Sequence, residues 1–159
     1  MTSMLATFSL LKVTAAPWGA DWMFMPLIVV TVIIHVIGVG LASDWIIQLC
    51  KGILTSRPKL GFAMIIGAIT VLATGLHALE AAIWAFAYVA INAIPDYKTA
   101  MLYSLGAMTT YGHETQVLEN RWQLMGSLEA LNGWLLFGLS SAFLFWLVQD
   151  LNPKNRVRH

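Results

Sequence analysis

Three apolar runs, almost free of charge, divide this chain. They extend over residues 22–43, 60–95 and 130–149, and only Glu80 interrupts the second run. A helix that crosses the hydrocarbon of a bilayer needs about 20 consecutive, mostly apolar residues. The pattern therefore predicts three transmembrane helices.

A fourth uncharged stretch, residues 99–113, is too short to cross a membrane. Its first half favours helix, and its second half is dense in small polar residues. Irregular backbone at membrane depth is tolerated only where it is buried in protein or lines a watery cavity. We therefore predict a short helix that starts after Pro95 and Asp96, enters the membrane and turns back between the second and third spans.

Composition excludes a soluble domain. Hydrophobic residues make up 58% of the 159 residues and charged residues only 11%, whereas a soluble domain carries about a quarter charged residues. The mean hydropathy is +0.73. The net charge of +1 gives no indication of a nucleic-acid partner, and a single cysteine, Cys50, excludes an intrachain disulfide. The composition is that of an integral membrane protein.

Basic residues indicate the orientation. They gather in the connection after the first span and in the C-terminal tail: Lys51, Arg57, Lys59, Lys154, Arg156 and Arg158. Both regions are expected to be cytoplasmic by the positive-inside rule. We therefore expect the N-terminus and residues 96–121 outside a bacterial plasma (inner) membrane and the C-terminus in the cytoplasm.

Residues 100–114 read Ala-Met-Leu-Tyr-Ser-Leu-Gly-Ala-Met-Thr-Thr-Tyr-Gly-His-Glu, and a glycine-containing helix follows from about Trp122. This order resembles the pore module of the potassium-channel-like superfamily, in which a Thr-Thr-Val-Gly-Tyr-Gly-Asp filter lies between a pore helix and an inner helix. The resemblance is greatest to small bacterial two-transmembrane pore-domain ion channels and covers about residues 75–150. Further matching positions are His77-x-x-Glu80, Trp84, Tyr103-Ser104, Glu129-Ala130-Leu131-x-Gly133 and Phe137-Gly138-x-Ser140.

The resemblance implies an all-α membrane protein with three transmembrane helices, a re-entrant pore helix and a filter loop, assembled as a homotetramer that conducts cations passively. Its pore domain would be residues 61–150, preceded by an interfacial segment (1–21) and an additional helix with its cytoplasmic connection (22–60), and followed by a cytoplasmic tail (151–159). No catalytic constellation is visible, so we expect no enzyme and no cofactor. The expected partners are further copies of the chain, membrane lipids, and permeating K⁺ and Na⁺.

The filter departs from the family pattern at its outer end. Thr109 and Thr110 keep the threonine pair and Gly112 keeps the first glycine, but Tyr111, His113 and Glu114 replace valine, tyrosine and the second glycine. The resemblance implies ion-facing carbonyls at Thr110, Tyr111 and Gly112, with His113 and Glu114 at the mouth. A glutamate ring is expected to weaken potassium selectivity and to attract Ca²⁺.

Two alternatives for these filter residues stay open. Residues 109–112 could be no more than a helix C-terminus capped by glycine. His113 could be an ordinary loop histidine, or part of a coupled cluster with Glu114 that titrates near neutral pH.

Polar residues within the spans are expected to support the filter. His77 and Glu80 share a helix face, and ionisable residues in a span face protein or water. We expect both to hydrogen-bond the pore helix or filter from behind. Glu129 is either a first-turn carboxylate favoured by the helix dipole or a brace to the pore loop. Gly133 and Gly138 are expected to allow close helix packing or to act as a hinge.

A metal site is not expected. Counted from the inner span boundaries at about 1.5 Å per residue, His35 lies roughly 12 Å and His77 roughly 25 Å into the membrane. A site with three protein ligands would need both.

Two other functions remain open beside the channel. One is a non-conducting membrane assembly protein that kept the pore-domain fold. The other is a proton-coupled transporter built on His35, His77 and Glu80, which is the weaker alternative because no inverted repeat is visible.

Overall fold

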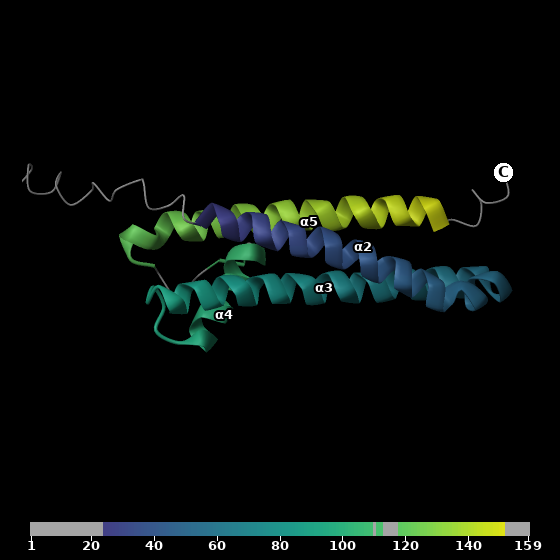
Figure 1. Cartoon of the computed structure of the whole chain (residues 1–159), viewed down its shortest axis with the longest axis horizontal. Helices are drawn as coiled ribbons and strands as arrows, with labels where there is room; N and C mark the ends of the chain where they lie inside the picture. Colours follow the sequence, from purple (N-terminus) through teal and green to yellow (C-terminus); the bar gives the residue numbers. More distant parts are fainter. Residues whose placement is uncertain (1–23, 110, 113–117, 152–159) are drawn as a thin grey trace, which may run out of the picture.

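A computed structural model describes residues 24–109, 111–112 and 118–151 of the chain. The expected interfacial segment 1–21, the tail after Leu151, and Thr110, His113 and Glu114 lie outside the described residues. The described part consists of helices and their connections (Figure 1), namely α2 (Met25–Ser56), α3 (Pro58–Ala90), α4 (Tyr97–Thr109), the short 3₁₀ helix η2 (Asn120–Trp122) and α5 (Gln123–Leu151).

Three of these helices are long and apolar enough to cross a membrane. They are α2, α3, and α5 together with η2, and they correspond to the three predicted spans. The prediction of an all-helical, multi-pass membrane protein is confirmed at this level. A short helix, α4, also lies between the second and third spans, as predicted.

The first span is longer than predicted. Instead of ending at Ser43, α2 continues through Asp44 and Lys51, and a turn at Arg57 leads directly into α3. Charged residues mark the edge of the hydrocarbon but do not end a helix, and all three charged side chains are exposed. At 32 residues α2 is about 48 Å long, whereas the hydrocarbon is about 30 Å thick. The predicted cytoplasmic connection is therefore mostly helix.

The second span ends earlier than the apolar run. Its last residue is Ala90, and Asn92 adopts a left-handed backbone with φ 55°. The Tyr88 carbonyl accepts hydrogen bonds from the N–H groups of Ala93 at 2.9 Å and Ile94 at 3.4 Å. This is a helix C-terminus closed by a left-handed residue. The helix therefore ends five residues before Pro95, the last residue of the predicted apolar run.

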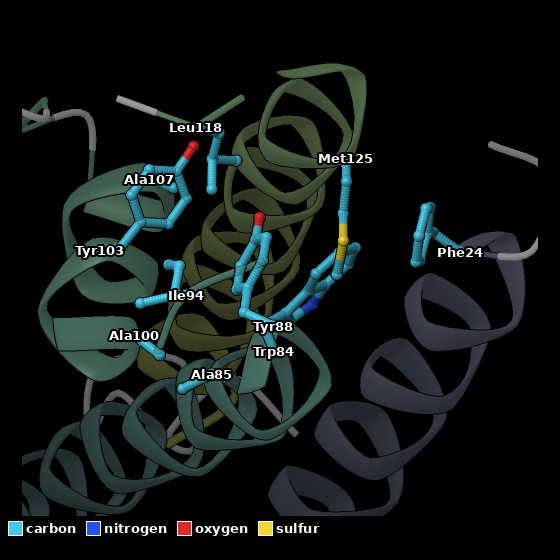
Figure 2. Packing of buried hydrophobic residues seen from close by; sticks show 10 residues of the cluster. All are labelled: Phe24, Trp84, Ala85, Tyr88, Ile94, Ala100, Tyr103, Ala107, Leu118 and Met125. Carbon is cyan, nitrogen blue, oxygen red and sulfur yellow. The ribbon is translucent and has the colours of Figure 1, made fainter. Parts of the chain in front are cut away.

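Two apolar clusters lie toward opposite ends of the helices. Near α4, ten buried side chains pack together from α3, α4, α5 and the adjoining segments, as Figure 2 shows. Near the Arg57 turn, Leu54, Ile65 and Ile69 of the α2–α3 hairpin pack against Leu147 and Leu151 of α5.

The buried face of α2 is the more polar one. Thr31, His35 and Ser43 are buried at spacings of four and eight residues, whereas Leu41 and Trp45 are 70% and 63% exposed. A membrane helix can expose apolar side chains to lipid, and its polar side chains then face protein. This orientation brings the polar residues of α2 against α3 and α5.

Candidate functional site

The short helix α4 extends from one end of the molecule into the middle of the bundle. In Figure 1 it crosses α3, and its C-terminal end lies between α3 and α5, both of which it contacts. Its last turn touches α5 at Gly133, about 15 Å along that helix from Gln123. Thr109 lines a cavity with Thr74, about 24 Å along α3 from Ala90. The end of α4 therefore lies inside the bundle, about a third of the way along α5.

Asp96 defines the start of α4. Its Oδ1 accepts a hydrogen bond from the Thr99 backbone N–H at 2.9 Å, which satisfies one of the free donors of the first turn. Hydrogen bonds from the Thr99 side chain and backbone lower the pKa of the Asp96 carboxyl below its usual value. The helix thus begins at a charged, exposed cap.

Glu129 holds α4 against the two spans. Its carboxylate is fully buried and accepts hydrogen bonds from the Ser104 hydroxyl of α4 and, at 2.7 Å, from the Tyr88 hydroxyl of α3. The Tyr88 and Tyr103 rings meet edge to face with centroids 5.2 Å apart. Glu129 lies in the second turn of α5, so the first-turn interpretation is wrong. It binds Ser104 of α4, and the predicted brace to the pore loop stays a prediction.

Gly133 and Gly138 have different surroundings. A Cβ built on Gly133 would lie 2.6 Å from the carbonyl oxygen of Met108 and 2.7 Å from its Cα, so only glycine permits this approach of α5 to the last turn of α4. Around Gly138 no atom lies within 4 Å of the corresponding position. Of these two glycines, therefore, only Gly133 allows close packing, and the helix that packs against it is α4.

The chain after α4 leaves the helix through Gly112, whose φ is 86°. Its N–H donates to the Gly106 carbonyl at 3.4 Å, and Tyr111 is 84% exposed. The Thr109 hydroxyl donates to the Leu105 carbonyl at 2.6 Å. A left-handed glycine here fits both a helix C-cap and the first glycine of a filter, so the two interpretations of this run remain open.

A cavity of about 470 Å³ lies beside the end of α4. It is lined by residues of α3, α4 and α5: Thr74, His77, Leu105, Met108, Thr109, Gly133, Trp134 and Phe137. Trp134 and Phe137 are 64% and 66% exposed, so the cavity opens onto an apolar surface.

His77 and Glu80 meet His35, which contradicts the predicted difference in depth. His35 Nδ1 lies 2.8 Å from Glu80 Oε1, and the two imidazole rings are 4.9 Å apart between centroids. The depth argument is wrong because α2 runs on to the turn at Arg57. Measured from that turn, His35 lies about 33 Å along α2 and His77 about 30 Å along α3.

Ser140 of α5 completes this group, which we call the polar cluster: His35, His77, Glu80 and Ser140. Its Oγ lies 2.7 Å from His35 Nε2 and 3.2 Å from His77 Nε2. The hydrogen bonds described for His77 and Glu80 are thus within this cluster and not to α4. His77 still borders the cavity that reaches the end of α4.

A further polar contact joins α2 to α5. Asn132 Nδ2 donates to Thr31 Oγ1 at 2.8 Å, and both residues are fully buried. Sequence reasoning missed this pair and the part played by Ser140. The signal was the spacing of Thr31, His35 and Ser43 on one face of the first span.

Comparison of the chain with protein-family models, curated proteins and solved structures finds no match.

Proposed function

We propose that this protein is one subunit of a homotetrameric cation channel. The observation that carries the proposal is the position of α4, whose C-terminal end lies inside the bundle, where Gly133 contacts it about 15 Å along α5. Backbone that turns at this depth must be buried in protein or line a watery cavity. A pore shared by several copies satisfies that condition.

The direction of α4 favours cations. The last carbonyls of a helix lack intrahelical partners and carry a partial negative charge. In α4 this end is the inner one, near Met108 and Thr109, and the charged cap at Asp96 is at the outer end. Four such ends around an axis would stabilise a cation that has lost part of its water.

The residues after α4 would form the filter. In this proposal the carbonyls of Thr110, Tyr111 and Gly112 bind the ion, and His113 and Glu114 form the mouth. Such a filter has fewer carbonyl sites than a potassium filter, so we propose weak discrimination between K⁺ and Na⁺. The left-handed Gly112 and the exposed Tyr111 support this assignment, because both leave backbone available to an ion.

The proposed orientation places the α2–α3 turn and the C-terminal end of α5 in the cytoplasm. These lie at the same end of the molecule in Figure 1, and Lys51, Arg57 and Lys59 lie near the turn. The positive-inside rule supports this placement. We propose a bacterial inner membrane with the N-terminus outside.

Recording from purified protein in planar bilayers tests the proposal. We expect unitary cation currents with similar reversal potentials for K⁺ and Na⁺, and block by Ca²⁺. Glu114→Gln should weaken Ca²⁺ block by about tenfold, because a ring of carboxylates attracts cations. Glu119→Gln is the matched control, since the exposed Glu119 pairs with Arg121 at 2.8 Å.

Three results would contradict the proposal in different ways. A folded oligomer without current would favour the non-conducting assembly protein. Slow uptake coupled to protons, without unitary steps, would favour a transporter. Strong potassium selectivity with equal Ca²⁺ block in wild type and Glu114→Gln would contradict the assigned mouth.

A further inference from the structure

The polar cluster joins all three spans at one depth. His35 comes from α2, His77 and Glu80 from α3, and Ser140 from α5. His35 and Glu80 are buried, and 30% of the His77 side chain is exposed. Ionisable side chains within spans are costly in lipid, so a cluster of three has to be satisfied within the protein.

Ser140 determines which ring nitrogens carry hydrogen. Its hydroxyl donates to the Leu136 carbonyl at 3.1 Å, so its oxygen can only accept from the two histidines. Both Nε2 atoms lie within 3.2 Å of that oxygen and must therefore donate their N–H to it. In neutral imidazoles this leaves both Nδ1 atoms as lone-pair acceptors.

Both Nδ1 lone pairs then face a carboxylate. His35 Nδ1 is 2.8 Å from Glu80 Oε1, and His77 Nδ1 is 3.3 Å from Glu80 Oε2. A single proton shared between His35 Nδ1 and Glu80 Oε1 satisfies the shorter contact. At the longer contact, His77 Nδ1 and Glu80 Oε2 then face each other as two hydrogen-bond acceptors. Glu80 Oε2 indeed has no hydrogen-bond partner among the described residues. A positive ion between these atoms would remove the conflict.

We propose that His35 Nδ1, His77 Nδ1 and the Glu80 carboxylate bind a divalent transition-metal ion of the Zn²⁺ class. One ligand atom from each residue lies within 4.8 Å of the others. Tetrahedral Zn²⁺ with bonds of about 2.0–2.1 Å holds its ligands roughly 3.3 Å apart, so small side-chain movements close the site. Imidazole nitrogen favours this class of metal over Ca²⁺ or Mg²⁺, which prefer oxygen ligands.

Two further features suit a metal site. Ligating histidines usually donate their other N–H to a fixed partner that orients the ring, and Ser140 is that partner for both rings. His77 also lines the cavity beside α4, which gives the ion a path to the buried ligands and leaves room for a fourth ligand such as water. The site does not depend on the proposed conduction.

Metal binding to the full-length protein in detergent, purified without a histidine tag, tests the proposal. We expect one Zn²⁺ per subunit, a higher thermal midpoint with Zn²⁺, and visible absorption bands of tetrahedral Co²⁺. Glu80→Gln should lower Zn²⁺ affinity by more than about 100-fold. A loss of about 10–100-fold is typical when the changed residue only orients a ligand and does not itself bind the metal. This variant should still fold, because the Gln amide can donate to His35 Nδ1, as the shared proton does in the wild type.

Two more variants complete the design. His77→Gln removes the most accessible ligand and should abolish the Co²⁺ bands. His159→Gln, which changes the histidine of the C-terminal tail, is the matched control and should bind as wild type does. Folded wild-type protein without stoichiometric Zn²⁺ or Co²⁺ binding would overturn the proposal and leave a proton as the occupant. Equal binding by wild type and Glu80→Gln would also overturn it. Neither result depends on channel currents.

Discussion

At the scale of single residues, buried polar side chains hold this apolar chain in one arrangement. Apolar packing between membrane helices has no hydrophobic driving force, because lipid is as apolar as a leucine side chain. A fully buried carboxylate such as Glu129 therefore specifies which hydroxyls must face it. Ser104 and Tyr88 supply them, and α4 is held in place by these contacts.

Glu129→Ala is expected to loosen α4 from α3 and α5. It leaves the hydroxyls of Ser104 and Tyr88 without their shared acceptor, at a cost of about 1–3 kcal/mol for each buried unpaired group. Thermal unfolding in detergent measures the loss. Glu129→Gln keeps an acceptor oxygen and should be milder. Equal destabilisation by both variants would show that the charge, and not hydrogen bonding, stabilises α4.

At the scale of the elements, α4 depends on its two ends. Its N-terminal end is capped by Asp96, and its C-terminal end fits against Gly133. A helix of 13 residues is marginal alone and needs such contacts. Substitutions at the two ends therefore test separately the N-terminal cap of α4 and its contact with α5.

The Asp96 cap predicts a pH dependence of the first turn of α4. Because hydrogen bonds lower the folded pKa of this carboxyl, its stabilisation is present at neutral pH and is lost as the pH falls through that lowered pKa. Amide hydrogen exchange of α4 should show falling protection in acid. Asp96→Asn keeps the capping oxygen without titrating, so its protection should not fall in this way. Parallel loss in both proteins would assign the effect to another group.

Gly133→Ala should displace the last turn of α4. The added methyl group meets the Met108 backbone, which cannot rotate away, and overpacking of this kind costs about 1–3 kcal/mol. We expect lower thermal stability and loss of conduction. Gly138→Ala is the matched control on the same helix and should be neutral, because open space surrounds it. If the Gly133→Ala protein still conducts, the position of the last turn of α4 does not determine conduction.

At the scale of the whole molecule, a large apolar surface stays uncovered. Trp134 and Phe137 border the cavity near the end of α4, and Phe86 is 68% exposed on α3. Lipid can cover all of this surface, but in a tetramer the part beside α4 would meet other copies. The proposed pore requires these contacts between copies of the chain.

Native mass measurement in detergent is expected to give four subunits. Trp134→Ala should weaken the tetramer, because it removes a large side chain beside the proposed subunit contact. Phe86→Ala removes an equally exposed aromatic side chain and serves as the control, with no change expected. A monomer or dimer as the only species would contradict the pore.

Local patterns by themselves determined the class of the molecule. Runs of apolar residues gave three spans and a short helix between them, because length and hydropathy are properties of a continuous segment. They did not locate the helix ends. Asp44 is compatible with helix, and the left-handed Asn92 closes α3 before Pro95.

Only the tertiary structure decided which polar residues meet. The contact of His35 with Glu80 depends on how far α2 runs before it turns and on how the helices rotate against each other. The different surroundings of Gly133 and Gly138 depend on where α4 ends. Such contacts join residues far apart in the chain, and the spacing along one helix carries no information about the depth or rotation of another.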